Sequence, residues 1–600
     1  MGFMRPLLRA ARLAAALAAV VVVAACSGDS EATLLSSARG YLDKHDAKAA
    51  VIQLKNLLQK NPDSGPARLL MGRALSELGD PAGAMVEYRK AQALHVADED
   101  LLPEMARAMM LTGEAAKVTA QFAGTELKHE SANADLHATV GAAFALQGNV
   151  EQAKAQSARA LQASPTESHG HTKKGYAYFF QGDYVQQHNS KSASASWREQ
   201  QLAEGKKSIA QNSNDAYGHD ITGIALFRLA EINAENKKPS QKLLDGAYDH
   251  FEAALKINPS FPWAYNDFAI ALLVEAQDKS QHNQNPLQAI EKVIETAKKA
   301  ITADESYIYA YNTITLAAMT ISAWQVKHGI NPSHYVEIGR NAAQRSIALN
   351  NKYTPAIGNL GNLYMILSFY DFISGNKIDE HYELAIKHFR SISDIDKNDL
   401  IPYISIPIVR YFEAGAKLDG DGDPAPAIEA GLELAAQGLK LAPDEPYCLE
   451  IQSRLHGAKA LWLKKQGRPH LAELELASRL SKQALVKIPE EQDALLGGAE
   501  IAYQLADAQL GRGKRPATIV QEGLTAVERA LASAAGTPRA LALRGALLSL
   551  RGKLEPNRKQ KQATLQAAQT AFAESFGGNP LLRRRYEGIQ REVEELLAGL

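Results

Sequence analysis

The chain has 600 residues, of which 46% are hydrophobic, 22% charged and 7% aromatic, a composition typical of globular proteins and too apolar for disorder. Its formal charge of −1 excludes a dedicated nucleic-acid binder, because such a protein needs a strongly basic face. The two cysteines, Cys26 and Cys448, exclude a disulfide framework and a zinc site built from thiolates.

The first 25 residues have the pattern of an export signal. Arginines stand at positions 5, 9 and 12, and an unbroken apolar stretch runs from Leu13 to Ala25. This stretch is too short for a settled transmembrane helix, which needs about 20 apolar residues. We therefore predict that residues 1–25 are a cleaved signal peptide.

The end of this segment, Val23-Ala24-Ala25-Cys26, resembles a bacterial lipobox, in which cleavage precedes an acylated cysteine. Cys26 is then the lipidation site and residues 26–32 form a tether. Ser27 in place of an aspartate resembles the default signal for outer-membrane sorting. We expect a lipid anchor on the periplasmic face of the outer membrane of a Gram-negative bacterium, because several acyl chains anchor firmly. The alternative is an ordinary secretory peptide with an accidental cysteine.

A repeat with a frame of 34 places begins at Glu31. Places 4, 8, 11, 20, 24, 27 and 32 hold Leu34, Ala38, Tyr41, Ala50, Leu54, Leu57 and Pro62, which is the pattern of a tetratricopeptide repeat. Two further frames follow: one starts at Gly65, and a later one has Gly141 at place 8. Small residues at some places let two antiparallel helices approach, and large residues at others fill the space beside them. The sequence therefore predicts an all-α, right-handed superhelical solenoid of about thirteen helical hairpins.

The repeats become longer after Pro165. Twenty-four residues separate Gly223 from Ala247, against 12 in the template, and the inserted residues are polar, which is typical of solvated turns or short helix extensions. We predict a compact array at residues 33–165, an array with enlarged loops at 166–580 and a capping helix at 581–600. A cap is expected because the last repeat otherwise leaves an apolar face open.

The string AAVIQLKNLLQKNPDSGPARLLMGRALSELGDPAGAMVEYRKA, with the lipobox before it, resembles the tetratricopeptide lipoproteins of exosortase and PEP-CTERM systems. The resemblance covers roughly residues 26–165. It implies a protein without enzymatic activity that serves exopolysaccharide production or the sorting of surface proteins. The rest of the chain is similar to bacterial tetratricopeptide arrays in general, including those appended to signalling proteins.

Motifs for catalysis or metal binding are weak. The sequence contains no G-x-S-x-G elbow, P-loop or H-E-x-x-H helix, so we expect no enzyme, cofactor or metal. Asp419, Asp421 and Asp423 alternate as in calcium loops, but Pro424 and Ala430 stand where an EF-hand has glycine and glutamate. An acidic hairpin loop is the favoured interpretation, and calcium binding stays open.

Other polar or reactive residues have ordinary explanations. His169, His171 and His188 are favoured as exposed or capping residues over a metal cluster. Cys448 is predicted to be a small packing residue. Basic residues gather at Lys553, Arg558, Lys559 and Lys561 and again at 583–585. A charged outer face is the favoured interpretation; the alternative is an anionic partner, either an acidic protein segment or a uronate-containing polysaccharide.

A partner-binding groove is predicted on the concave surface that the first helices of the hairpins line. An asparagine there can bond a peptide backbone through both its carbonyl and its amino group. The candidate groove residues are Arg39, Arg73, Tyr265, Asn266, Tyr311, Asn312 and Asn362.

The leading hypothesis is a lipid-anchored periplasmic adaptor with no chemistry of its own. It binds protein partners of an envelope export or surface-assembly system, linked to exopolysaccharide or to an exosortase. The alternatives are a sensor or regulator of a signalling partner, an enzyme with an unrecognised glycan-active site, and passive bracing of the envelope.

Overall fold

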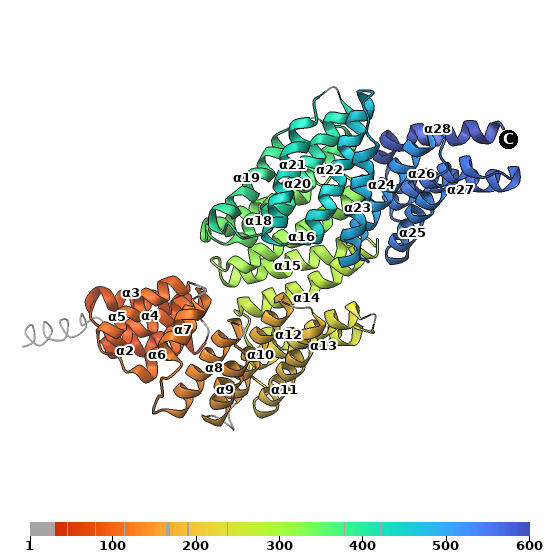
Figure 1. The fold of residues 1–600 in the computed structure, drawn as a ribbon. Coiled ribbons are helices and arrows are strands. Elements are labelled where there is room, and N and C mark those ends of the chain that lie inside the picture. Colours follow the sequence, from red (N-terminus) through yellow and green to blue (C-terminus); the bar gives the residue numbers. More distant parts are fainter. Residues whose placement is uncertain are drawn as a thin grey trace, which may run out of the picture. The chain divides into compact units, whose positions relative to one another are not determined.

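The computed structural model describes residues 30–600 apart from residues 45, 79, 113, 148, 164–167, 189–190, 237, 377–378 and 421. Over these residues 27 α-helices follow one another as consecutive pairs and a last single helix, with two short 3-10 turns and no strand (Figure 1). The predicted all-α tetratricopeptide solenoid with a C-terminal cap is therefore confirmed. No described helix is long and apolar enough to cross a membrane.

The chain divides into two compact units. Unit 1 comprises Met1–Ala271 and Lys299–Tyr307, and unit 2 comprises Leu272–Lys298 and Ile308–Leu600. The described helices of unit 1 are α2 (Glu31–Leu42), α3 (Ala47–Lys60), α4 (Gly65–Glu77), α5 (Pro81–Ala93), α6 (Asp98–Leu111), α7 (Ala115–Phe122), α8 (Glu130–Leu146), α9 (Val150–Ala163), α10 (Ser168–His188), η1 (Ser192–Ser194), α11 (Ala195–Gln211), α12 (Ala216–Glu235) and α13 (Gln241–Ile257).

Helices α14 (Pro262–Gln281) and α15 (Leu287–Ala303) contribute residues to both units. The described helices of unit 2 alone are α16 (Ile308–Lys327), α17 (Ser333–Leu349), α18 (Thr354–Ser374), α19 (Asp379–Ile395), α20 (Ile401–Asp419), α21 (Ala425–Leu441), α22 (Pro446–Lys465), α23 (Leu471–Lys487), α24 (Gln492–Leu510), α25 (Ala517–Ser533), α26 (Pro538–Leu554), α27 (Arg558–Gly578), η2 (Pro580–Leu582) and α28 (Arg583–Ala598). Even-numbered helices up to α26 are the first helices of the pairs, and odd-numbered ones are the second.

Short polar side chains fix where the early helices begin. Asp46 Oδ1 accepts the backbone N–H of Ala49 at 3.0 Å, and Asp80 Oδ1 accepts that of Gly83 at 2.7 Å. Each cap satisfies an N–H that has no partner inside the helix. These aspartates therefore set the boundary between the two helices of a hairpin.

The two helices of a hairpin meet where a glycine lies against an aromatic ring. A Cβ atom on Gly361 of α18 would lie 2.8 Å from Phe389 Cε1 of α19, and one on Gly223 of α12 would lie 2.9 Å from Phe251 Cε1 of α13. Both rings are fully buried. A residue with a side chain at either glycine would force the helices apart, which explains the small residue at place 8 of the frame.

Residues added after residue 165 lengthen the helices more than the loops. Helices α4 and α5 have 13 residues each, whereas α12 and α13 have 20 and 17. The contact between Gly223 and Phe251 is kept in this longer hairpin. The inserted polar residues therefore act mainly as helix extensions, one of the two interpretations that their composition allowed.

The C-terminal segment closes unit 2 against its own earlier helices. Asn579 is 2% exposed, and its Nδ2 donates to the carbonyl oxygens of Val326 (3.3 Å) and Lys327 (3.1 Å) at the end of α16. Arg584 Nη1 donates to the carbonyl oxygen of Phe372, 212 residues earlier, at 3.4 Å. The predicted capping region 581–600, here η2 and α28, thus contacts the beginning of unit 2 as well as its last hairpin.

Candidate partner-binding surfaces

Three first helices of unit 2 and the capping helix α28 carry charged side chains that bond one another. We call this set the ion-pair ladder; it consists of Glu450 and Arg454 on α22, Asp493 and Glu500 on α24, Arg539 on α26 and Arg585 on α28. Arg539 Nη2 lies 3.0 Å from Glu500 Oε2, and Arg585 Nη2 lies 3.7 Å from Glu500 Oε1. Arg454 bonds Glu450 and also donates to the carbonyl oxygen of Asp493 at 2.7 Å.

Little free space is left beside Arg585 of the ladder. The Arg585 guanidinium lies 4.8 Å from the centre of the Phe372 ring, a cation–π distance. The cavity beside these two residues, also lined by Tyr411 and Gln504, has a volume of about 20 Å³. A cavity of this size holds about one water molecule. The space between Phe372, Tyr411 and Arg585 is therefore filled by the chain itself.

The two arginines beside Glu500 lower the pKa of its carboxyl. Burial opposes ionisation of this carboxyl, but the guanidinium groups of Arg585 and Arg539 outweigh it and hold the pKa of Glu500 below its ordinary value. The carboxylate stays ionised near neutral pH and leaves no charge for a partner to satisfy.

The first helices of unit 1 differ in charge pairing. Arg73 Nε lies 3.2 Å from Glu104 Oε1, and Arg107 Nη2 lies 3.7 Å from Asp135 Oδ2. Three further carboxylates, those of Glu77 on α4, Asp220 on α12 and Asp267 on α14, form no ion pair with any described residue. Asp220 is fully buried; its Oδ2 accepts the Tyr176 hydroxyl at 3.1 Å, and its Oδ1 has no hydrogen-bond partner.

Desolvation makes these carboxyls weak acids. Burial raises the pKa of Asp267 to about 7, with Arg228 on α12 opposing the shift and Asp183 on α10 adding to it. Burial and then the charge of Asp267 raise the pKa of Asp220. The Glu77 side chain reaches solvent, yet desolvation by the surrounding protein and then the Glu104 carboxylate raise its pKa to about 7. These three acids of unit 1 are therefore protonated more readily than ordinary carboxyls, and none of them has an ion-pair partner among the described residues.

We expect replacement of Asp267 by asparagine to stabilise unit 1 more at pH 8 than at pH 5, by about 1–3 kcal/mol. The folded-state pKa of about 7 exceeds the ordinary value of 3.8, so the folded protein binds more protons between these values. Its stability therefore falls as pH rises through this window. Asparagine removes that loss because it stays neutral, and Arg228, Asp183 and Asp220 remain around it. Urea denaturation followed by circular dichroism at both pH values measures the difference.

The matched control is Asp249→Asn, an exposed aspartate on α13 of the same unit. Its effect is expected to be the same at both pH values. An Asp267→Asn effect that is equally independent of pH would contradict a raised pKa at this carboxyl.

The predicted groove residues fall in both units. In unit 1, Arg39 on α2 is exposed, Arg73 pairs with Glu104, Tyr265 is half-buried, and Asn266 is only 3% exposed. In unit 2, Tyr311 and Asn312 on α16 and Asn362 on α18 are half-buried. Asn312 Oδ1 accepts the side-chain amide of Asn359 at 2.9 Å, so neighbouring first helices bond through these asparagines.

The residues considered for metals have protein partners where they are described. Asp423 Oδ1 accepts the backbone N–H of Ala425 at 3.0 Å, and Asp419 lies 3.6 Å from Arg584; Asp421 lies outside the described residues. Among the described residues no group of three or more ligand side chains is arranged to hold a metal.

The remaining predicted positions are described only in part. His171 Nδ1 lies 2.6 Å from Glu204 Oε2, while the side chains of His169 and His188 are not described. Cys448 is fully buried, and burial raises the pKa of its thiol to about 12. Cys26 lies outside the described residues.

The three unpaired carboxylates were not among the predicted groove residues. Asn312 and Asn359 bond across 47 residues, and the same spacing separates Asp220 from Asp267 in the sequence. A search for polar residues at this longer period would have found Asp220 and Asp267, but not Glu77. Whether a carboxylate forms an ion pair depends on the residues of the neighbouring helices, and the repeat period does not specify those residues.

The fold is similar to solved tetratricopeptide structures at low identity. These include the Cut9–Hcn1 complex of the APC/C (11% identity, 95% of this chain and 98% of that chain, TM-score 0.35), yeast Tom70 (14%, 73% and 89%, 0.29) and the human IFIT1 dimer with m7Gppp-AAAA (14%, 70% and 90%, 0.33). No protein-family model and no curated protein matches the chain. The helices define the class, a tetratricopeptide-repeat protein, and the similar structures add no argument about its partners.

Proposed function

We propose that this protein is a scaffold that binds a protein partner on the first helices of unit 1. The observation that carries the proposal is the contrast between the two units. The ladder of unit 2 satisfies its own charges, whereas Glu77, Asp220 and Asp267 of unit 1 have no cation within ion-pair distance among the described residues. Glu77 is exposed and Asp267 is partly exposed, so these two can accept N–H donors or cations from a bound segment, whereas Asp220 is fully buried behind them.

The setting proposed for this scaffold is the periplasmic face of an outer membrane, with the chain held by lipid on Cys26. The lipobox pattern, in which the small residues Ala24 and Ala25 precede Cys26, supports the anchor. The resemblance of residues 26–165 to exosortase and PEP-CTERM lipoproteins supports an envelope export or surface-assembly system as the source of partners. The scaffold has no chemistry of its own in this proposal.

One experiment tests both parts. Cells expressing the full chain with the photo-crosslinking amino acid p-benzoylphenylalanine at Tyr265, next to Asn266 and Asp267 in sequence, are irradiated and fractionated. The expected result is one dominant protein adduct in the membrane fraction, and Cys26→Ser is expected to move the protein to the soluble periplasmic fraction. Mass spectrometry identifies the adduct.

The control position is Glu252, an exposed residue on the second helix α13. It is expected to give no dominant adduct. A Cys26→Ser protein that stays membrane-bound overturns the lipid anchor, and equal adducts from Tyr265 and Glu252, or none from either, overturn the binding surface and favour passive bracing.

A further inference from the structure

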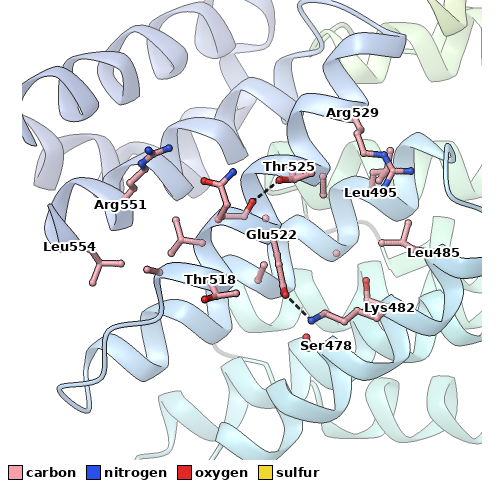
Figure 2. A pocket seen from close by; sticks show the side chains of 18 of the residues that line it. Ser478, Lys482, Leu485, Leu495, Thr518, Glu522, Thr525, Arg529, Arg551 and Leu554 are labelled. Carbon is pink, nitrogen blue, oxygen red and sulfur yellow. Dashed lines mark hydrogen bonds and ion pairs between the residues drawn. The ribbon is translucent and has the colours of Figure 1, made fainter. Parts of the chain in front are cut away.

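A pocket of about 770 Å³ lies on the second helices of unit 2, between α23 and α25. Its volume is within the range of about 300–1,000 Å³ that is usual for ligand pockets. Figure 2 shows Arg551 and Leu554 of α26 at one end, and Arg529 of α25 with Leu485 of α23 at the other. An ion pair of 2.9 Å between Lys482 and Glu522 joins α23 to α25.

Small residues make this space. Ser478 and Ser481 of α23, Gly498 and Ala502 of α24 and Ala526 of α25 line the pocket where larger side chains would fill it. A Cβ atom on Gly498 would lie 2.7 Å from Ser481 Oγ, so the floor already packs closely beneath the opening. The hollow therefore lies between two second helices and does not result from loose packing inside a hairpin.

Apolar side chains form much of the wall. Leu485, Leu495, Val520 and Leu554 line the pocket together with Ala502. Binding is favoured when apolar side chains of a ligand replace water against this lining, by roughly 25 cal/mol for each Å² of apolar surface that is buried. Polar side chains such as Ser478, Thr518 and Gln521 stand beside these apolar residues and can bond the polar groups of a peptide. The lining favours a protein ligand.

Two basic connections between helices, which we call the basic loops and which include the adjoining helix ends, adjoin the Arg551 end of the pocket. Residues 511–516 contain three basic and no acidic residues, and residues 551–561 contain five basic residues and one acidic residue. Arg515 of the first loop donates to the carbonyl oxygen of Leu554, which lines the pocket. The two loops are therefore neighbours on one edge of unit 2.

Five of these cations have no acidic partner among the described residues. They are Arg512, Lys514, Arg558, Lys559 and Lys561. Arg558 and Lys559 also open α27, after the cap residue Asn557, in a first turn without acidic residues. Cations at a helix N-terminus are unfavourable because the helix dipole is positive there. Their presence costs local stability and leaves their charge available to an anion.

We propose that the pocket and the two basic loops form a docking site for an acidic protein segment with apolar side chains. The apolar side chains enter the pocket between α23 and α25, and the carboxylates face Arg512, Arg558 and Lys559. The site lies on second helices of unit 2. It is separate from the proposed surface on unit 1, so either one can fail without the other.

The probe is a fluorescein-labelled helical peptide with leucines on one face and glutamates on the other, an amphipathic arrangement that suits grooves between helices. Fluorescence anisotropy measures its binding to the purified full chain at low and at physiological salt. Two matched peptides, with glutamine for glutamate and with serine for leucine, are expected to bind at least about tenfold more weakly. Binding of the parent peptide is expected to weaken with salt.

Two variants test the two parts of the site. Thr525→Trp fills the pocket from an exposed position of α25; its control is Thr570→Trp on α27, where the threonine hydroxyl makes the same bond to the carbonyl oxygen four residues earlier. Arg558→Glu with Lys559→Glu reverses the charge of the loop; its control is Lys387→Glu with Arg390→Glu, exposed residues of α19. Each test variant is expected to weaken binding at least about tenfold, and the controls less than about twofold.

Stability separates lost binding from damaged folding. The Arg558→Glu, Lys559→Glu protein is expected to unfold at the same or a higher temperature than the parent, because acids favour a helix N-terminus. Absence of parent-peptide binding, or equal binding by Thr525→Trp and Thr570→Trp proteins, overturns the proposal. Displacement of the peptide by alginate together with unchanged binding of the Thr525→Trp protein also overturns it, in favour of a polysaccharide surface.

Discussion

Replacement of Glu500 by alanine is expected to lower the free energy of unfolding of unit 2 by about 3–5 kcal/mol. Glu500 accepts from Arg539 at 3.0 Å and lies 3.7 Å from Arg585, and its side chain is 12% exposed. Without Glu500, the guanidinium groups of Arg539 and Arg585 stay desolvated but lose the anion that they share. The free-energy cost of leaving these desolvated cations with one fewer anion exceeds the net stabilisation that the ion pairs provided. Urea denaturation followed by circular dichroism gives the size of the loss.

Hydrogen exchange shows where the loss occurs. Faster exchange is expected in α24, α26 and α28, the helices that supply Glu500, Arg539 and Arg585. The control is Glu490→Ala, since Glu490 is 76% exposed and pairs with Arg529 at the surface, where an ion pair contributes about 0–1 kcal/mol. Equal losses from Glu500→Ala and Glu490→Ala would show that the ladder is no more than a set of surface pairs.

Replacement of Phe389 by alanine is expected to cost about 3–5 kcal/mol. The ring is fully buried in α19 and lies against Gly361 of α18, where no side chain can move in to fill the space. The loss therefore includes a cavity as well as the transfer of apolar surface to water. Because each hairpin contacts mainly its neighbours, exchange is expected to rise in α18, α19 and α20 and to change little in α2 to α9.

Val486→Ala on α23 is the matched control for Phe389→Ala, since Val486 is 77% exposed. Its expected effect is within about 0.5 kcal/mol. A Phe389→Ala protein with stability close to that of the parent would mean that α18 and α19 collapse onto the cavity, and the glycine-to-ring contact would then not hold the hairpin together.

The pairing of charged side chains differs between the two units. Unit 2 uses its ladder and the segment Asn579–Arg585 to hold its first helices together. In unit 1 the partly exposed carboxyl of Asp267 lowers stability at neutral pH without an ion-pair partner in return. Functional sites commonly keep such unfavourable groups, because a partner that binds them recovers the lost free energy.

The repeat frame predicted the hairpins because its signals are local. Leu54 and Ala50 mark the buried side of one helix, and Asp46 marks where that helix begins. These features depend on residues a few positions apart, so a single amino-acid sequence is enough to predict them. Local signals could not decide whether the residues inserted after residue 165 form turns or extend the helices. The longer helices α12 and α13 show that most of them extend the helices.

The candidate surfaces depended on contacts that the frame does not contain. Asn266 occupies a predicted groove position yet is 3% exposed, and its neighbour Asp267 is the residue with the perturbed pKa. A position in the frame gives the direction of a side chain relative to its own helix. Exposure and acidity are set by the next helices, whose residues stand about one repeat away.

By itself the sequence determined an all-α chain of stacked hairpins with a terminal cap, since helical periodicity and capping arise from nearby residues. Only the tertiary structure decided that Asn579 reaches the carbonyl oxygen of Val326, 253 residues earlier, that Glu500 pairs with Arg539 and Arg585, and that a pocket opens between α23 and α25. Small changes in the angle between successive hairpins add up over many repeats, and no local pattern specifies where their sum brings distant residues together.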